Sequence, residues 1–390
     1  MKTIIKNAKV IAPHEVIDGS SVVIEEGKIV DVLDSTSKLS KKDHSVIDAQ
    51  GKYLSPGFID IHNHGNSGYD FMDSTFEAIE KIAEFHLKNG VTGFLATTIT
   101  ASKEETINAL KNVKDYINNV QKDKAKIQSE LLGVYLEGPY FSQKKKGAQP
   151  LKHIKNPDVN ELKELVTISG NSIKVVALAP ELQGASKVLG YLEKQGIAPF
   201  AGHTDGSFEE IKKAIFHGLV GTTHLFNGMR GFSHREPGAV GAVLIDERVM
   251  CELICDGIHV HPGAMELAYK LKGKEGLILV SDAMMAAGLP EGEYQLGGQK
   301  VFVKGKAARL ENDSLAGSTL TLNKAVYNMI NMVGIPVCEA VRMATLNPAQ
   351  MIGVSRDKGS IEAGKDADLI IFDDEINVTD VIIGGITRRY

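Results

Sequence analysis

The sequence predicts an α/β fold: a closed (β/α)8 barrel of the TIM type, with a small β-sandwich domain built from both chain termini. Three observations support this prediction. Eight short apolar runs follow one another from residue 54 onward, and helical segments separate most of them. Near-continuous apolar runs are typical of parallel strands buried on both faces. β-rich segments flank this region at both ends, and 390 residues are enough for one barrel and an accessory domain.

Residues 1–53 are predicted to form the N-terminal part of the β-sandwich. They contain short β-rich segments with turn residues between them, and Glu26-Gly27 marks a hairpin turn. After Gly353 the chain becomes β-like again, so residues 354–390 are predicted to complete the sandwich. The N-terminal segments are residues 4–10, 21–25, 28–33 and 45–48.

Residues 54–353 are predicted to form the barrel. Apolar residues recur at helical spacing between the runs; Ile79, Ile82 and Ala83 do so within residues 76–89, before Gly90. The Gly-rich segment 292–310 is predicted to be a hairpin inserted after the eighth strand. The predicted strands are residues 54–61, 91–98, 131–136, 173–179, 197–201, 221–225, 249–255 and 277–280. The other predicted helices are residues 103–120, 160–166, 185–195, 208–217, 262–271, 319–333 and 337–344.

Composition and charge argue against several kinds of protein. Hydrophobic residues make up 43% of the chain, and the net charge of −5 gives no reason to expect a nucleic-acid partner. No apolar run reaches the ~18 residues needed to cross a membrane, and the N-terminus turns polar too early for a signal peptide. Cys251, Cys255 and Cys338 have no zinc-ribbon spacing. We therefore expect a cytoplasmic protein with reduced, buried thiols.

Polar side chains follow five of the predicted barrel strands, directly where each strand ends. His62 and His64 follow the first strand, and residues two apart on a strand point to the same face. Because barrel active sites lie at the carboxyl ends of the strands, we expect all these side chains at one mouth of the barrel. The others are Glu137 after the third strand, His203 after the fifth, His224 after the sixth and Asp282 after the eighth.

Imidazole nitrogens and a carboxylate are ordinary ligands for Zn²⁺ and also suit Fe²⁺. A catalytic metal with three protein ligands keeps a position open for water and lowers the pKa of that water toward neutrality. A nearby carboxylate can take a proton from the water and pass it to a leaving group. Asp282 is the candidate for this role. His86 and His217 lie within helical segments and are predicted to be structural.

These features resemble the amidohydrolase superfamily and, within it, the N-acetylglucosamine-6-phosphate deacetylase family. The resemblance covers essentially the full length of the chain. It implies hydrolysis of an N-acetyl amino-sugar phosphate in amino-sugar catabolism and recycling. The motifs that carry it are Pro56-Gly57-Phe58-Ile59-Asp60, Leu136-Glu137-Gly138-Pro139, Gly202-His203-Thr204, His224-Leu225-Phe226-Asn227-Gly228-Met229, Asp256-Gly257-Ile258-His259 and Ser281-Asp282-Ala283.

The resemblance also implies a role for each site residue. Glu137, His203 and His224 would hold the principal metal ion, and His62 and His64 would support a second, so one or two zinc or iron ions are expected per subunit. Asp282 would be the acid and base. A homodimer is implied, in which an arginine of one subunit completes the pocket of its neighbour. The implied sugar-phosphate contacts are Ala148, Asn227, Gly228, Arg235, His259, Leu315, Ala316 and Gly317. Some family members carry a histidine where this chain has Gln149.

Several alternatives remain open from the residues alone. Arg235 and His259 suit a phosphate, yet Arg235 could instead pair with Glu236, and His261 is a rival to His259. Cyclic-amide hydrolysis or deamination competes with deacetylation, and an inactive barrel that only binds ligands is the non-enzymatic alternative. Many cyclic amidases use a carboxylated lysine after strand four, where this chain has Ala179-Pro180-Glu181. This difference favours the deacetylase.

Overall fold

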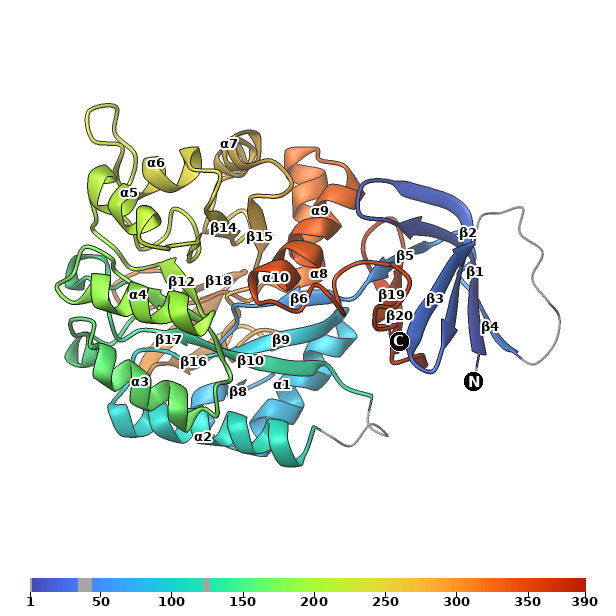
Figure 1. The fold of residues 1–390 in the computed structure, drawn as a ribbon, viewed down its shortest axis with the longest axis horizontal. Coiled ribbons are helices and arrows are strands. Elements are labelled where there is room, and N and C mark those ends of the chain that lie inside the picture. Colours follow the sequence, from blue (N-terminus) through green and yellow to red (C-terminus); the bar gives the residue numbers. More distant parts are fainter. Residues whose placement is uncertain (1, 34–43, 122–126) are drawn as a thin grey trace.

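The computed structural model describes residues 2–33, 44–121 and 127–390 and arranges them as a barrel beside a small β domain (Figure 1). The barrel sheet has eight parallel strands, which confirms the predicted (β/α)8 fold. Its two end strands meet at the carboxyl ends, where the Asp282 amide donates a 2.9 Å hydrogen bond to the His62 carbonyl. The strands are β6 (Phe58–Asp60), β9 (Val91–Thr97), β10 (Glu130–Glu137), β11 (Ile173–Leu178), β12 (Ala198–Ala201), β13 (Gly221–Thr222), β14 (Met250–Leu253) and β15 (Leu277–Leu279).

Helices surround this sheet, and the predicted ones begin and end close to their expected residues. Side-chain caps fix several starts: Ser102 and Glu105 form a capping box at α2, and Ser207 and Glu210 form another at α5. The helices are α1 (Phe76–Lys88), α2 (Lys103–Asn119), α3 (Val159–Ile168), α4 (Ala185–Gln195), α5 (Phe208–Phe216), α6 (Gly238–Ile245), α7 (Pro262–Lys272), α8 (Leu322–Asn328), α9 (Val337–Ala344) and α10 (Leu346–Met351), with a π-helix at Met329–Val333. None of the helices in the described ranges is long and apolar enough to cross a membrane.

The structure differs from the sequence-based expectation in the first barrel strand, in helix α6 and in helix α10, which the sequence did not predict. The run predicted as one strand at 54–61 is divided at Gly57 into β5 (Tyr53–Pro56), which pairs within the small domain, and β6 of the barrel. A side chain at Gly57 would lie 2.1 Å from Thr92, so only glycine fits where the chain crosses between domains. Helix α6 was not predicted, because its sequence Gly-Ala-Val-Gly-Ala-Val-Leu-Ile has no polar face and almost all of it is buried.

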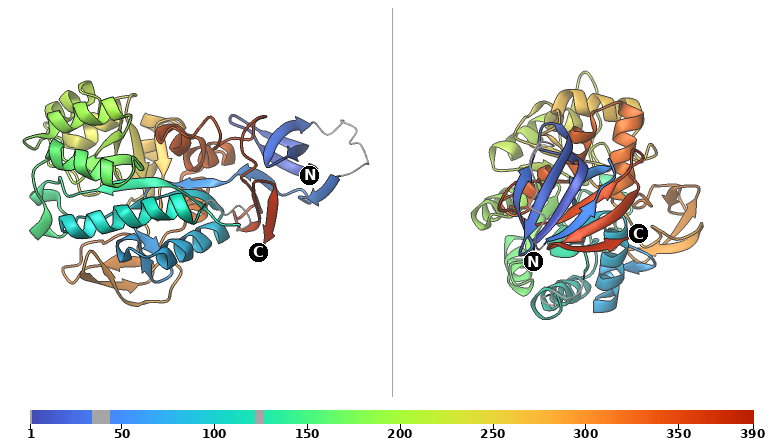
Figure 2. Two further views of the ribbon diagram at one scale, coloured as in Figure 1. Left: turned by 60° about the horizontal axis from the view of Figure 1, so that its bottom comes forward. Right: turned by 90° about the vertical axis from the view of Figure 1, so that its right-hand side faces the viewer.

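The small β domain joins both ends of the chain, as predicted, and both termini lie in it (Figure 2). Its sheet has the order β21-β20-β19-β5-β1-β2-β3, with β4 also pairing β1. Ile5, Val22, Leu54 and Leu369 pack into one apolar core, so the sheet folds over on itself. Its strands are β1 (Lys2–Ile11), β2 (Val16–Glu25), β3 (Lys28–Leu33), β4 (His44–Asp48), β5, β19 (Leu369–Phe372), β20 (Val378–Ile383) and β21 (Ile386–Arg389).

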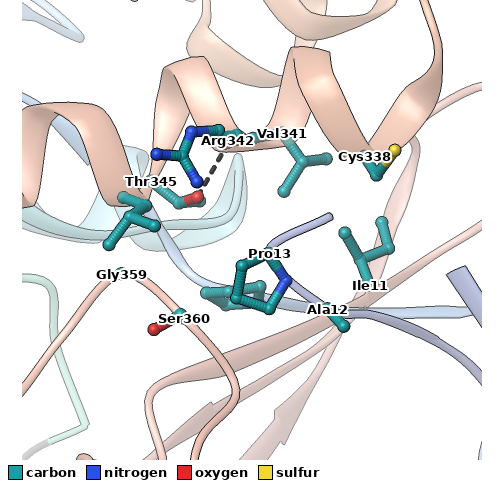
Figure 3. Close-up of a pocket in the computed structure, with 11 residues that line it drawn as sticks. Ile11, Ala12, Pro13, Cys338, Val341, Arg342, Thr345, Gly359 and Ser360 are labelled. Carbon is teal, nitrogen blue, oxygen red and sulfur yellow. Dashed lines mark hydrogen bonds between the residues drawn. The ribbon is translucent and has the colours of Figure 1, made fainter. Parts of the chain in front are cut away.

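Beside helix α9 the contact between the two domains is closely packed. Figure 3 shows a crevice between Ile11–Pro13 of the small domain and Val341 and Arg342 of α9. It holds about 10 Å³, room for a single water at most. Cys338 lies here and is partly exposed, which corrects the expectation that all three thiols are buried; Cys251 and Cys255 are buried.

The segment inserted after β15 forms the predicted hairpin, extended by a third strand, and covers one side of the barrel mouth. It forms the antiparallel strands β16 (Gly292–Leu296), β17 (Gln299–Lys304) and β18 (Ala307–Arg309). Leu296 packs with Ile99 and Met284 in an apolar cluster of its own. The Gln299 side chain donates a hydrogen bond to the Ala148 carbonyl. The insertion therefore forms one wall beside the ends of the barrel strands.

Candidate metal centre

The structure brings the six predicted side chains together at the barrel mouth as two adjacent groups. His62, His64 and Asp282 form one group, and Glu137, His203 and His224 form the other. Within each group the potential ligand atoms lie within 4.8 Å of one another, and all six residues are buried. Side chains from five separate strand ends therefore converge, because the parallel strands of the barrel end at one face.

Glu137 lies between the two groups. Its Oε1 atom is 3.4 Å from His203 Nε2, 3.3 Å from His224 Nε2 and 3.7 Å from His62 Nε2. Its Oε2 atom is 3.4 Å from His64 Nε2. One carboxylate thus faces imidazoles of both groups, which is the arrangement that a bridging ligand requires.

The orientation of two imidazoles fits a bound cation. The Nδ1 atom of His203 donates to the Lys145 carbonyl at 2.8 Å, and Nδ1 of His224 donates to the Asn227 carbonyl at 3.1 Å. Each neutral ring therefore carries its lone pair on Nε2, and these two Nε2 atoms lie only 3.2 Å apart. Two lone pairs at this separation repel unless a cation lies beside both, so the residues fit a metal ion.

Gln149 occupies the position whose role the sequence left open. Its side-chain amide donates to Glu137 Oε2 at 2.6 Å, and its carbonyl oxygen accepts from the Thr100 amide at 2.9 Å. These two hydrogen bonds fix the orientation of the Gln149 amide, with its nitrogen toward Glu137 and its oxygen toward Thr100. Gln149 therefore holds the central carboxylate in place.

Three of the six residues have backbone conformations that are uncommon outside glycine. The φ angles are +45° at His203, +30° at His224 and +47° at Asp282. Such positions cost about 1–3 kcal/mol each and persist only where surrounding contacts impose them. At Asp282 the contacts are main-chain hydrogen bonds to His62 and Ser318. At His203 the neighbouring Gly228 leaves space, since a side chain there would lie 2.9 Å from the imidazole.

The electrostatics of the centre favour a cation. Burial alone would raise the pKa of Glu137, but the imidazoles around it hold that pKa well below its usual range. Burial likewise opposes ionisation of Asp282, yet His62 and the neighbouring histidines lower its pKa to about 2. Burial disfavours a charged His62, but the carboxylates of Glu252 and Asp282 raise its pKa to about 10. The groups therefore attract positive charge, which a divalent ion supplies without protons.

A cavity of about 320 Å³ opens above the centre. Ile99 and Leu296 form its apolar side. Most residues predicted to contact substrate line it: Ala148, Asn227, Gly228, His259, Leu315 and Gly317. Ala316 does not line it, because its side chain is fully buried beneath the inserted hairpin.

His259 and its rival His261 have different environments. The Nδ1 atom of His259 donates to Asp256 Oδ2 at 2.6 Å, which leaves Nε2 free for the cavity that the residue lines. His261 instead caps α7 by accepting a hydrogen bond from the Gly263 amide at 3.1 Å. The geometry therefore favours His259 as the residue that contacts a ligand.

Arg235 lies outside the cavity of its own chain. It is in an exposed loop, residues 231–236, after β13. Its sequence neighbour Glu236, raised above as an alternative partner, accepts hydrogen bonds from the amides of Phe208 and Gly238 instead. Of the described residues that line the cavity, none is a lysine or an arginine. Among the described lining residues, a phosphate bound there would therefore find no guanidinium or ammonium group.

Sequence reasoning missed Glu252 on β14. This residue is fully buried, and its carboxylate accepts a 2.8 Å hydrogen bond from His62 Nδ1. The only signal in the sequence was an acidic residue inside the apolar run that became β14. Its partner could not be found from the sequence, because 190 residues separate the two.

His86 on α1 is structural, as predicted, and makes stability depend on pH. Its Nε2 atom donates to Asn63 Oδ1 at 3.0 Å, and burial lowers its pKa from 6.5 to about 3. Between these values the unfolded chain binds a proton that the folded chain does not. The His86 contribution to the free energy of unfolding should therefore fall by about 1.4 kcal/mol for each pH unit below 6.5.

The measurement is urea unfolding of the wild type and His86→Gln between pH 7.5 and 5. Glutamine can still donate to Asn63 but does not titrate. The wild type should lose stability relative to the variant as the pH falls, whereas parallel pH profiles would contradict the prediction.

Comparison with known proteins identifies similar chains. The model of the amidohydrolase family matches residues 53–387. The N-acetylglucosamine-6-phosphate deacetylase of Lysinibacillus sphaericus is 38% identical over 388 residues, covering 100% of this chain and 98% of that protein. The N-acetylgalactosamine-6-phosphate deacetylase of Escherichia coli O157:H7 is 39% identical over 341 residues, 87% of this chain and 89% of that protein. The crystal structure of N-acetylglucosamine-6-phosphate deacetylase from Pasteurella multocida has a TM-score of 0.93 at 31% identity and covers 100% of both chains.

Proposed function

This chain belongs to the amidohydrolase family, and from that premise we propose that it is a metal-dependent deacetylase of N-acetylglucosamine 6-phosphate. The products are glucosamine 6-phosphate and acetate, a step of amino-sugar catabolism and recycling. The observation that carries the proposal is the pair of buried His/carboxylate groups around Glu137, beneath a cavity at the barrel mouth. The full-length similarity to a deacetylase of this sugar phosphate supports the substrate.

The residues at the centre fit one or two divalent ions. Glu137, His203 and His224 would hold the principal ion, and His62 and His64 would support a second, with Glu137 between them. Imidazole and carboxylate ligands suit zinc or iron. An ion bound there supplies Lewis-acid chemistry, which polarises a carbonyl and makes water more acidic.

Asp282 is the proposed general base and then general acid. Its carboxylate takes a proton from the attacking water as the new carbon–oxygen bond forms at the acetyl carbonyl. It then gives this proton to the sugar nitrogen as the carbon–nitrogen bond breaks, because an amide anion is a very poor leaving group. Because its pKa is lowered, Asp282 is ionised at neutral pH, which is the form that can accept a proton.

The position of Glu137 supports a deacetylase over a cyclic amidase or deaminase. Glu181, at the end of the fourth strand, bonds the Thr204 hydroxyl and the Asp205 amide and is in neither ligand group. Glu137 from the third strand faces both groups instead. The central carboxylate therefore comes from a different strand than in the lysine-bridged enzymes.

Substrate would bind in the cavity above the centre. The proposed sugar-phosphate contacts are Asn227, Gly228 and His259, with the backbone near Ala148 and with Leu315 and Gly317 of the loop after the hairpin. A phosphate requires positive donors as well, and we propose that Arg235 of a second subunit supplies them in a homodimer. The lack of any lysine or arginine among the described residues lining the cavity supports this proposal.

An exposed apolar surface beside the Arg235 loop supports a second copy of the chain as partner. Helix α6 packs against α5 and α7, and Figure 1 shows the three helices next to one another. Phe216 is 79% exposed and Phe232, in the loop itself, is 67% exposed. The remaining exposed apolar side chains of this surface are Ile245, Leu267 and Leu271. Large exposed apolar side chains gathered on neighbouring elements are typical of interfaces.

The experiment that tests the function is measurement of acetate release by the metal-loaded protein. N-acetylglucosamine 6-phosphate should be hydrolysed efficiently and unphosphorylated N-acetylglucosamine poorly. The similarity to an N-acetylgalactosamine-6-phosphate deacetylase makes that epimer the second candidate, and the ratio of the two kcat/KM values decides between them. No acetate from either sugar phosphate would disprove the proposed function.

The metal content of variants from each ligand group should show which group binds the principal ion. Protein purified without chelator should contain between one and two equivalents of a transition metal. His203→Ala should lose more metal and activity than His62→Ala, since His203 belongs to the group proposed to bind the principal ion. Elemental analysis of both variants checks this, and the opposite order would mean that the other group binds first.

A further inference from the structure

Glu252 is a buried carboxylate in β14 that contacts both ligand groups. Its Oε2 atom accepts from His62 Nδ1 at 2.8 Å and from the His224 amide at 3.1 Å. Its Oε1 atom has no hydrogen-bond partner among the described residues. Burying a carboxylate costs several kcal/mol unless nearby positive charge or donors offset it. The hydrogen bond from the His62 imidazole is therefore one of the contacts that offset the cost of burying Glu252.

The hydrogen bond to Glu252 decides how His62 faces the centre. A carboxylate only accepts hydrogen bonds, so a neutral His62, which is the form that binds a metal, carries its proton on Nδ1. The opposite nitrogen, Nε2, is buried without a hydrogen-bond partner among the described residues. It lies 3.5 Å from Asp282 Oδ1 and 3.7 Å from Glu137 Oε1. The lone pair of His62 is thus directed at the place where the two groups meet.

Tyr135 further restricts the ring of His62. The two ring centroids are 4.7 Å apart, and the Tyr135 hydroxyl forms a 2.7 Å hydrogen bond with Thr223. The other imidazole of the group is less constrained, because Nδ1 of His64 is buried with no partner among the described residues. Within the group of His62, His64 and Asp282, hydrogen bonding to Nδ1 therefore orients only His62.

The environment of His62 also differs in charge from that of the principal group. The Nδ1 atoms of His203 and His224 donate to neutral carbonyls, whereas His62 donates to an acid. Glu137, Asp282 and Glu252 place three buried carboxylates around the centre. With neutral imidazoles and three ionised carboxylates, one divalent ion leaves a net negative charge, which attracts a second ion.

We propose that Glu252 is the positioning residue that makes His62, His64 and Asp282 a second metal site. It orients His62 with Nε2 toward the ion and makes that nitrogen a stronger ligand through the charge behind the ring. The inference rests on the proposed metal-dependent function. It goes beyond that function because it makes binding of the second ion depend on Glu252, a residue that would touch neither an ion nor the substrate.

Glu252→Gln tests the proposal with little change of shape. The glutamine oxygen can still accept from His62 and His224, but the negative charge is gone. The dissociation constant of the second ion should rise 10–100-fold, the usual effect of removing such a partner, while the first ion stays bound. Equilibrium dialysis against graded free zinc, followed by elemental analysis, measures the two equivalents separately.

Glu181→Gln is the matched control. Glu181 is also a largely buried acid at a strand end, but it bonds Thr204 and Asp205 rather than a ligand group. This control should keep both ions. Thermal unfolding of each variant shows whether the fold is intact, because a merely structural role of Glu252 would lower stability and weaken both ions together.

The possible outcomes separate this inference from the proposed function. Unchanged binding of both ions in Glu252→Gln, or equal weakening of both, overturns the role of Glu252. A wild type that binds one ion and releases acetate also overturns it but leaves the deacetylase proposal intact. A wild type that binds two ions and loses one in Glu252→Gln, yet releases no acetate, supports the positioning role and disproves the function.

Discussion

Replacing Asp282 with asparagine is expected to lower turnover at least about a hundredfold, the low end of typical acid–base contributions. Asparagine has nearly the same shape, but its amide cannot take a proton from water or return one to the sugar nitrogen. The principal ion, held by Glu137, His203 and His224, should remain bound. Steady-state acetate release and elemental analysis of the same preparation measure the two effects together.

Asp205→Asn is the control for this change. Asp205 is also an acid near the end of a barrel strand, but its carboxylate pairs with Arg230 and Lys144. It should keep most of the turnover. Near-normal turnover in Asp282→Asn with a full complement of metal would show that another group carries the proton.

Replacing Arg235 with alanine is expected to raise the KM for the phosphorylated sugar about a hundredfold, since truncating one partner of a buried charge pair costs about 2–5 kcal/mol. A guanidinium forms two parallel hydrogen bonds to a phosphate, and a pocket between subunits excludes the water that would weaken them. The already poor use of unphosphorylated N-acetylglucosamine should barely change. Arg248→Ala, which removes an exposed arginine paired with Asp246, is the control.

A mixing experiment decides whether Arg235 acts across the subunit boundary. In a dimer of one Arg235→Ala subunit and one Asp282→Asn subunit, one of the two sites has both residues intact. Random pairing in a two-fold dimer should then restore activity at about a quarter of all sites. Equal losses of kcat/KM on the phosphorylated and unphosphorylated sugars in Arg235→Ala alone would exclude a role of Arg235 in phosphate recognition. Confirmed subunit exchange without recovered activity would place the role of Arg235 within one chain.

The barrel was predictable because its strands are buried on both faces. Such strands read as short apolar runs, and each predicted run overlaps a barrel strand of the structure. The helices that sequence reasoning found have one apolar and one polar face. Helix α6 lacks a polar face, so the periodic signal was absent. The run at 54–61 was read as one strand because apolar character is the same on both sides of Gly57, where the chain changes domain.

By itself, the sequence determined the fold class, the five candidate ligands and the candidate acid and base Asp282, because polar residues directly after apolar runs must gather where parallel strands end. Only the tertiary structure decided which side chains face one another. It placed Gln149 on Glu137 and Glu252 on His62, directed His259 rather than His261 at the cavity, and left Arg235 outside it. The physical reason is that hydrogen bonds depend on ångström distances between residues far apart in the chain, whereas strand order and polarity are local properties of the sequence.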